Sequence, residues 1–209
     1  MELFIRYIGE NWADLLVLTY QHIVMVLLGL ALALAAGVPL GIAASRHRTL
    51  GKVILTVANI IQVFPSLALL VLLMIVFGLG STTVVIGLFL YSLLPVIRNT
   101  YVGLTQVSPT LLEAGRGVGM SPMQILINVQ LPLALPFILT GIRVAAVIAI
   151  GVATIAPLVG GSGLGREIYA GINMDNPARL YAGAIPAALL ALLADLALGR
   201  LHRTVKFGK

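Results

Sequence analysis

The polar residues best placed to contact a water-soluble partner lie between residues 113 and 132, in the sequence EAGRGVGMSPMQILINVQLP. Glu113 and Arg116 offer charges of opposite sign, and the glycines around them allow another chain to approach closely. A helical segment of this kind would fit a groove on a soluble subunit. The alternative is an ordinary solvated surface loop.

Other chemistry has little support in the residues. The chain has no cysteine, which excludes disulfides, thiol catalysis and cysteine-ligated metals, and its three histidines (His22, His47 and His202) are far apart in the sequence. The glycine-rich stretch 160–166, GGSGLGR, lacks the GxxxxGK[ST] spacing of a phosphate loop. We therefore expect no catalytic residue, metal site or bound cofactor, and no enzyme activity of this chain by itself.

The composition is that of an integral membrane protein. Of the 209 residues, 60% are hydrophobic and 10% are charged, whereas soluble domains are roughly 25% charged. A bilayer core about 30 Å thick needs roughly 20 apolar residues in a helix, so the chain can form about five or six spans. We expect one transmembrane domain over residues 1–209, with any ATP-hydrolysing or ligand-capturing domain on another chain.

Five apolar runs define the expected helices. They cover residues 17–44, 53–79, 83–97, 133–159 and 180–198, and Pro65 interrupts the second. The sequence therefore predicts an all-α fold of about five transmembrane helices, with a kink at Pro65. Residues 1–16 alternate apolar and charged side chains at helical spacing, which predicts a short interfacial helix. The alternative is a frayed first turn of span one, and we expect this N-terminus to be retained rather than cleaved.

The net charge of +6 is placed as a topology signal rather than as a nucleic-acid surface. Arg46, Arg48 and Lys52 follow the first run, and another basic cluster begins at Arg200 after the last. Short cytoplasmic loops carry an excess of Lys and Arg. We therefore expect an outer N-terminus, a cytoplasmic loop over residues 99–131, an outer loop over 160–179 and a cytoplasmic C-terminus.

Within the cytoplasmic loop, two serines are placed to begin helices. Ser108 and Ser121 each precede a proline (Pro109 and Pro122), which suits the first helical position. The loop is predicted to form a helix, a turn at Gly119 and a second helix before the chain re-enters the membrane.

These residues resemble the signature loop of the membrane subunits of binding-protein-dependent ABC importers. Glu113, Ala114, Gly119, Leu131 and Pro132 match that pattern. Gly115 replaces an alanine, which loosens a helix by up to about 1 kcal/mol. The resemblance implies a type I importer transmembrane domain whose coupling helices dock on a cytoplasmic ATPase. It places the coupling role on Glu113, Ala114, Gly115, Arg116, Gly119, Leu131 and Pro132.

The resemblance extends over most of the chain. The segments 60–70, 90–104, 131–143, 155–165 and 183–195 are similar to permeases that import quaternary-ammonium osmoprotectants such as glycine betaine, choline and carnitine. It implies a bacterial cytoplasmic membrane location, an ATPase dimer that holds ATP and Mg²⁺, a second identical or related permease and an extracytoplasmic binding protein. The alternatives are a permease for an amino acid or a betaine-like thiol compound, an ion-coupled secondary transporter, and a scaffold.

Polar residues within the spans are candidates for the translocation path. Asn59, Gln62 and Ser66 are spaced to share one face of the second helix, beside Pro65. The alternative is hydrogen bonding between helices. Weaker candidates are Tyr91, Ser92, Thr140 and Thr154. The few aromatic residues form no evident cage for a quaternary ammonium, so we expect selectivity to reside mainly in the binding protein.

Three further expectations concern the spans and the outer loop. Gly160, Gly161, Gly163 and Gly165 are candidates for an outer gate or a binding-protein contact, with a plain turn as the alternative. Arg143 and Asp195 lie inside apolar runs and are expected to pair with one another or each to contact the loop. The alternative is that their side chains simply extend toward the interface. Gly29, Gly37 and Gly41 are placed to allow close helix packing.

Overall fold

The computed structural model describes residues 2–207, with side chains as far as residue 204, and it is built from helices. The α-helices are α1 (Glu2–Arg46), α2 (Arg48–Val63), α3 (Ser66–Phe77), α4 (Ser81–Thr105), α5 (Pro109–Gly117), α6 (Pro122–Ile125), α7 (Leu131–Ala153), α8 (Gly165–Asn173) and α9 (Pro177–Phe207). A π-helical turn, Leu126–Gln130, joins α6 to α7, and a 3₁₀ turn, Ala156–Val159, follows α7.

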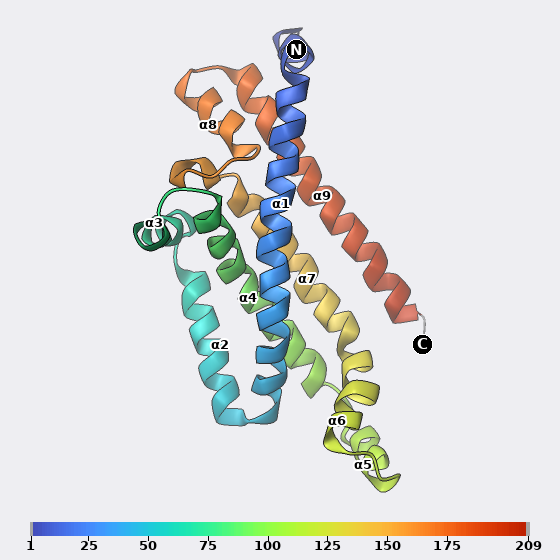
Figure 1. Cartoon of the computed structure of the whole chain (residues 1–209). Helices are drawn as coiled ribbons and strands as arrows, with labels where there is room; N and C mark the ends of the chain where they lie inside the picture. Colours follow the sequence, from blue (N-terminus) through green and yellow to red (C-terminus); the bar gives the residue numbers. More distant parts are fainter. Residues whose placement is uncertain (1, 208–209) are drawn as a thin grey trace.

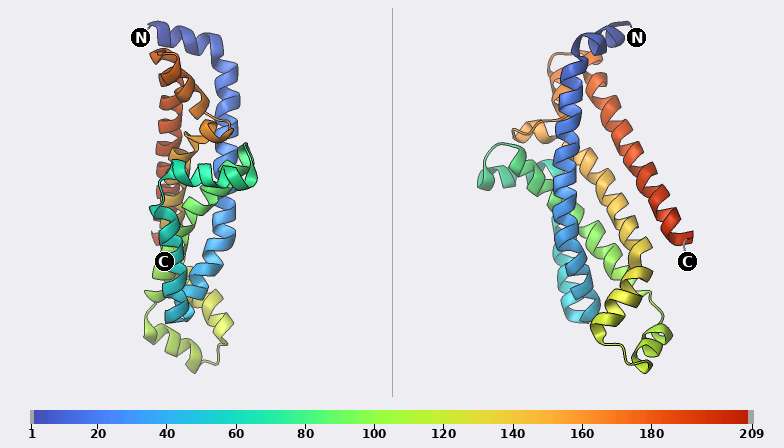
Figure 2. Two further views of the ribbon diagram at one scale, coloured as in Figure 1. Left: turned by 90° about the vertical axis from the view of Figure 1, so that its left-hand side faces the viewer. Right: turned by 45° about the vertical axis from the view of Figure 1, so that its right-hand side comes forward.

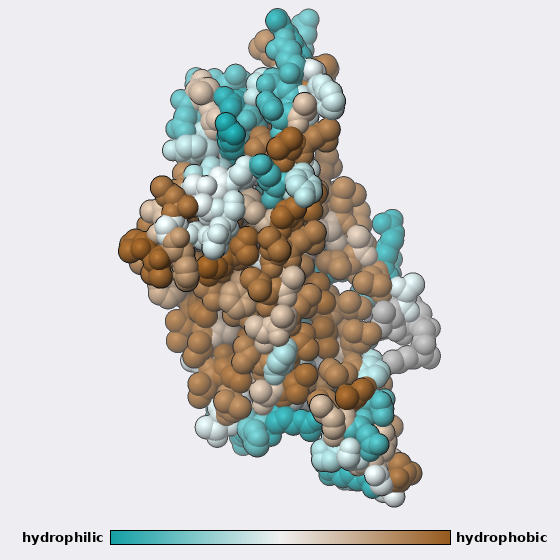
Figure 3. Space-filling view, in the orientation of Figure 1, coloured by the Kyte–Doolittle hydropathy of each residue, from teal (hydrophilic) through white to brown (hydrophobic). Residues whose placement is uncertain are grey.

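Four helical stretches among the described residues are long and apolar enough to cross a membrane: α1, α4, the continuous stretch from α6 through α7, and α9. The pair α2 and α3 would make a fifth span, but it bends by 99°. Figure 3 shows a broad hydrophobic belt between two hydrophilic ends. The predicted all-α membrane fold with about five spans is confirmed.

Helix α4 packs between α1 and α7 (Figure 1). A Cβ atom added at Gly29, Gly37 or Gly41 of α1 would lie within 2.6–2.8 Å of a side-chain atom of α4. Small residues of this kind let two helix backbones approach and so bring more atoms into van der Waals contact. The predicted close packing at these glycines is confirmed, and its partner is α4.

The N-terminal segment differs from the expected separate helix. Residues 2–16 belong to α1, which continues through the first span to Arg46 without a break. Figure 2 shows, however, that the first turns of α1 run across the axis of the rest of the helix. Residues 2–16 therefore run in a different direction from the rest of α1 without ending the helix.

The loop expected over residues 99–131 is shorter than predicted. Helix α4 continues beyond Arg98 to Thr105, because Thr100 and Leu104 are buried and Asn99 donates a hydrogen bond to the carbonyl of Pro95 at 2.8 Å. The chain also re-enters the membrane region without a break, since α6, the π turn and α7 form one helical stretch. The loop itself is thus the segment 106–121.

The other expected runs also differ at their ends. The second run is divided at Phe64 and Pro65, where the chain turns so sharply that α3 lies across α2 (Figure 1). Proline has no amide hydrogen to donate and disfavours helical backbone in the residue before it, which accounts for the break. The fourth run ends at Ala153, before Pro157. The loop expected over residues 160–179 contains a short helix, α8, that the sequence interpretation omitted.

Candidate functional site

The loop between α4 and α7 projects from one end of the molecule (Figure 1). Ser121 and Gln124 form a capping box that begins its second helix: the Gln124 amide donates to the Ser121 hydroxyl at 3.3 Å, and the Ser121 amide donates to Gln124 Oε1 at 2.7 Å. This satisfies two amides that have no partner within the helix. The first helix begins at Pro109 as predicted, but the Ser108 side chain makes no capping hydrogen bond.

The turn between the two helices depends on Gly119. Its φ angle is +84°, a left-handed conformation that L-residues with a side chain adopt at a cost. The amide of Met120 donates to the carbonyl of Gly115 at 3.0 Å, and the amide of Gly119 donates to that of Arg116 at 3.0 Å. This pair of bonds is a Schellman motif, so the predicted glycine turn is present and its geometry is defined.

The side chains of α5 divide between an inner and an outer face. Gly115 is buried against Ile125 and Met120, whereas Glu113, Ala114 and Arg116 are exposed. A cavity of about 210 Å³ lies beside α5 and is lined by Arg116, Met120 and Ile125, among others. Helix α5 therefore rests on α6 and leaves both charges accessible to a partner.

The end of the signature segment connects the loop to the spans. Leu131 packs against the buried cluster of Leu104, Leu126, Ala134 and Ile138, which joins α4, the π turn and α7. Pro132, at the second position of α7, is exposed. Because the helix is continuous through this region, a displacement of the loop can pass directly into α7.

The candidate path residues do not share one face. Gln62 and Asn59 lie on α2, but Ser66 begins α3 beyond the 99° bend, so the prediction of a single face over Asn59, Gln62 and Ser66 is wrong. The physical reason is the break at Pro65. Asn59 is exposed and Gln62 is half-buried in this chain, which leaves both able to face a path formed with another subunit.

Three other path candidates lie in different surroundings. The hydroxyl of Tyr91 on α4 donates to the carbonyl of Phe64, so Tyr91 holds the end of α2 at the bend. Ser92 is fully buried, and Thr140 donates to the carbonyl of Pro136 at 2.9 Å. Among the described residues, no hydrogen bond joins them to Asn59, and their role in a path stays a prediction.

The glycines of segment 160–165 pack closely against the spans. Gly160 and Gly163 have φ angles of +77° and +100°, and a Cβ at Gly163 would lie 3.1 Å from the Cβ of His22. A Cβ at Gly161 would meet Val84 at 2.6 Å, and one at Gly165 would overlap the carbonyl oxygen of Thr154. These glycines hold the segment against α1, α4 and the end of α7, while a gating role stays a prediction.

A charged network at the same end was missed by the sequence interpretation. Glu167 of α8 is buried, Arg179 of α9 donates to its two oxygens at 2.8 and 3.1 Å, and the Tyr7 hydroxyl donates to it at 2.6 Å. Burial raises the pKa of Glu167, but the hydrogen bonds from Arg179 and Tyr7, with the charges of Arg179 and Arg166, outweigh it and leave the pKa below its ordinary value. The charged residues Arg166 and Glu167, which directly follow the glycine segment, were the sequence feature that could have indicated this network.

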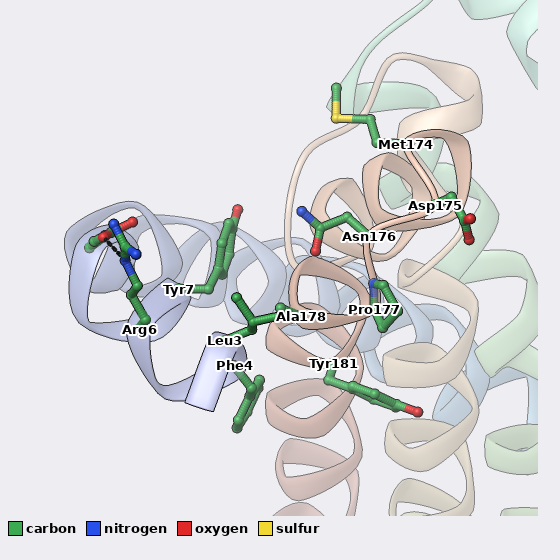
Figure 4. Close-up of a pocket in the computed structure, with 11 residues that line it drawn as sticks. Leu3, Phe4, Arg6, Tyr7, Met174, Asp175, Asn176, Pro177, Ala178 and Tyr181 are labelled. Carbon is green, nitrogen blue, oxygen red and sulfur yellow. Dashed lines mark hydrogen bonds and ion pairs between the residues drawn. The ribbon is translucent and has the colours of Figure 1, made fainter. Parts of the chain in front are cut away.

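Beside this network is a hollow of about 580 Å³ between the start of α1 and the turn from α8 to α9. Figure 4 shows Leu3 directed toward Ala178, while the Tyr7 ring points to the opposite side from Phe4 and Tyr181. Because these three rings do not face a common point, the hollow is not an aromatic box for a cation. Its lining is mainly apolar and suits the edge of a membrane.

The predicted pairing of Arg143 with Asp195 is confirmed. Arg143 donates from Nε and Nη2 to the two carboxylate oxygens of Asp195, at 2.5 and 2.6 Å. Among the residues that the structure describes, no group of three metal-ligating side chains is clustered.

These observations define the class of the protein: it is a multi-pass helical membrane protein with a helical loop that projects from one end. A family model for the inner membrane component of binding-protein-dependent transport systems matches residues 37–207. The chain belongs to this family, and it is therefore a permease-type component of an inner membrane.

Related proteins cover nearly the whole chain. It is 46% identical over 200 residues to the glycine betaine/carnitine/choline transport system permease protein OpuCD of Bacillus subtilis (strain 168), covering 95% of this chain and 87% of the relative. It is 45% identical over 202 residues to the carnitine transport permease protein OpuCD of Listeria monocytogenes serotype 1/2a (strain 10403S), covering 96% and 91%. A chain of the MetNI methionine ABC transporter in inward-facing conformations matches with a TM-score of 0.82 at 23% identity, covering 91% and 95%. The fold is that of a type I ABC importer transmembrane domain.

Proposed function

We propose that this chain forms the translocation path of an ATP-driven importer for a small quaternary-ammonium osmoprotectant such as glycine betaine, carnitine or choline. The observation that carries the proposal is the exposed loop helix with Glu113 and Arg116, built on a chain about 45% identical to carnitine and betaine permeases. The whole chain, residues 1–209, acts as one permease domain, and the bent first segment lies at the outer membrane interface.

The partners follow from the family. A cytoplasmic ATPase dimer binds ATP and Mg²⁺ and receives α5 in a surface groove, while a second permease subunit completes the path and an extracytoplasmic protein delivers the solute. The N-terminus and α8 lie outside, and the loop and the C-terminus lie in the cytoplasm. The clusters at Arg46 and Arg200 support this orientation.

In the proposed mechanism, closure of the ATPases moves α5, and the exposed charges of Glu113 and Arg116 transmit that contact. Gly115 lets α5 lie close to α6, Gly119 forms the turn between the two helices, and Ala114 belongs to the exposed face offered to the ATPase. Leu131 and Pro132 pass the displacement into α7. Opening of the glycine segment Gly160–Gly165 would admit the solute to a path that includes Asn59 and Gln62. The helices would move as rigid bodies and open the path alternately to each side, so that the solute is released on the inner side.

The test is reconstitution of the permease with its ATPase and binding protein in liposomes, with uptake of labelled glycine betaine, carnitine, choline and methionine. ATP-dependent uptake of the quaternary ammonium compounds is expected, and uptake of methionine alone would overturn the proposed substrate class. Glu113→Lys should leave membrane insertion intact and weaken ATPase docking, with Glu10→Lys on exposed α1 as the control. Unchanged docking and uptake would remove Glu113 from the mechanism.

A further inference from the structure

A second cavity at the outer end differs in character from the apolar hollow. It has a volume of about 280 Å³ and lies between α1 and the segment that leads into α8 and α9. Sites for drug-sized ligands measure roughly 300–1,000 Å³, so this cavity suits a smaller solute. Its lining includes Tyr7, Asn11, Asp14, Gln21, Ser162 and Arg166.

One wall of this cavity is fixed by groups that are already paired. Glu167 accepts from both Arg179 and Tyr7, and the Ser162 hydroxyl donates to the side-chain oxygen of Gln21. The Tyr7 hydroxyl is therefore tethered, which restricts the orientation of its ring. These bonds join α1, α8 and α9 and make the wall a preformed surface.

Two charges in the lining have no such partner. Within the described part of the chain, neither Asp14 nor Arg166 belongs to an ion pair, and both are exposed. Glu167 and Arg179 form an ion pair with one another. The charged groups of the lining that are left for a ligand are therefore the carboxylate of Asp14 and the guanidinium of Arg166. A simple cation would leave Arg166 unmatched, and a simple anion would leave Asp14 unmatched.

We infer that this cavity is an outer binding site for a small zwitterion that carries a quaternary ammonium and a carboxylate. The planar guanidinium of Arg166 is suited to a two-point contact with the carboxylate. The carboxylate of Asp14 and the face of Tyr7 attract the quaternary ammonium, which has no hydrogen to donate. This inference rests on the proposed function, because glycine betaine is a ligand of this class.

The position of the site suits a step between delivery of the solute by the binding protein and its passage through the membrane. It borders the outer segment through Ser162, next to the closely packed glycines Gly161 and Gly163. A solute released at the outer face would meet this cavity beside the segment proposed to open. The permease would thus hold the solute briefly instead of relying on the binding protein alone.

The experiment measures equilibrium binding of labelled glycine betaine to the permease–ATPase complex in lipid nanodiscs, without the binding protein. Asp14→Asn and Arg166→Gln are each expected to weaken binding by about tenfold or more. Matched controls are Glu10→Gln and Arg6→Gln, which change the same charges on a neighbouring exposed ion pair and should leave binding unaltered. Equal binding by all four variants would overturn the inference.

An analogue series on the unmodified complex keeps the test independent of protein variants. Choline lacks the carboxylate, and 3,3-dimethylbutyrate has a carbon in place of the quaternary nitrogen, so each should compete about tenfold or more less effectively than glycine betaine. Equal competition by either analogue, or no saturable binding, would refute the zwitterion site. Uptake in the reconstituted system separates the two proposals: betaine uptake without saturable binding defeats only the site, whereas absence of uptake defeats the proposed function.

Discussion

Arg143 of α7 and Asp195 of α9 face one another across two helices and form a two-point ion pair, with N–O distances of 2.5 and 2.6 Å. Close beside it, a Cβ at Gly199 of α9 would lie 3.3 Å from the Arg143 guanidinium. Nearer the C-terminus, His202 contacts the Pro136 carbonyl at 3.0 Å. These contacts hold the second half of α9 to the helix that continues from the loop.

The first prediction concerns this pair. Asp195→Asn and Arg143→Gln should each lower uptake to less than half of the parent's value while ATPase activity persists. The reason is that, without the ion pair, α9 would no longer move together with α7. The reversed pair, Arg143→Asp with Asp195→Arg, should recover part of the loss. Uptake and ATP hydrolysis measured on the same proteoliposomes test this, and full activity in the single variants would contradict it.

A second prediction concerns Gly115. A Cβ at this position would lie 3.4 Å from Ile125 and Met120, an ordinary contact distance. Gly115→Ala should therefore stabilise α5 by up to about 1 kcal/mol. The matched variant Gly119→Ala should instead destabilise the loop by roughly 1–2 kcal/mol, since φ there is +84°. Hydrogen exchange of the α5 amides should slow in the first variant and accelerate in the second.

A third prediction concerns the contact of α1 with α4. Gly41→Ala would place a Cβ 2.6 Å from that of Thr100 and 3.0 Å from the Ile97 carbonyl oxygen. The overlap should cost about 1–3 kcal/mol, seen as a lower melting temperature in detergent. Gly9→Ala is the control, because nothing lies within 4 Å of its Cβ. Equal melting temperatures of the Gly41→Ala and Gly9→Ala variants would show that α1 and α4 can move apart without loss of stability.

Features set by neighbouring residues could be predicted from the sequence. The N-cap at Ser121, the glycine turn and the five apolar runs depend on spacings within a few residues. The small residues of α1 indicated a close helix contact before its partner was known. Pairing of Arg143 with Asp195 followed because a charge in an apolar run needs a counter-charge.

Features that depend on the meeting of distant segments could not be predicted in the same way. Tyr7 and Glu167 are separated by 160 residues, and the sequence around either residue does not predict its contact with the other. The bend at Pro65 is 99°, sharper than an ordinary proline kink, and Tyr91, from another helix, donates to the Phe64 carbonyl beside it. Continuation of α4 past Arg98 likewise reflects burial of Thr100 and Leu104.

A fourth prediction concerns that bend. Tyr91→Phe removes the donor to the Phe64 carbonyl and should cost about 0.5–1.5 kcal/mol, because that carbonyl loses its hydrogen-bond partner. Since the chain has no cysteine, spin labels on Val76→Cys and Leu28→Cys can report the position of α3 relative to α1. The distance distribution should broaden in Tyr91→Phe and remain unchanged in Tyr20→Phe, whose side chain is exposed. A distribution as narrow as that of the parent would show that Pro65 alone sets the bend.

The last prediction concerns the pH dependence of the network formed by Glu167, Arg179 and Tyr7. The pKa of Glu167 lies below its ordinary value of 4.5, so its ionised form is favoured in the folded protein. The stability that it contributes is therefore fully present above that ordinary value and is lost as pH falls through the lower folded pKa. Hydrogen exchange in α8 should then be constant between about pH 5 and pH 8, once corrected for the intrinsic rate, and should accelerate only in stronger acid. Glu167→Gln should accelerate exchange at neutral pH and abolish the acid step, whereas a step retained in that variant would place its origin in another group.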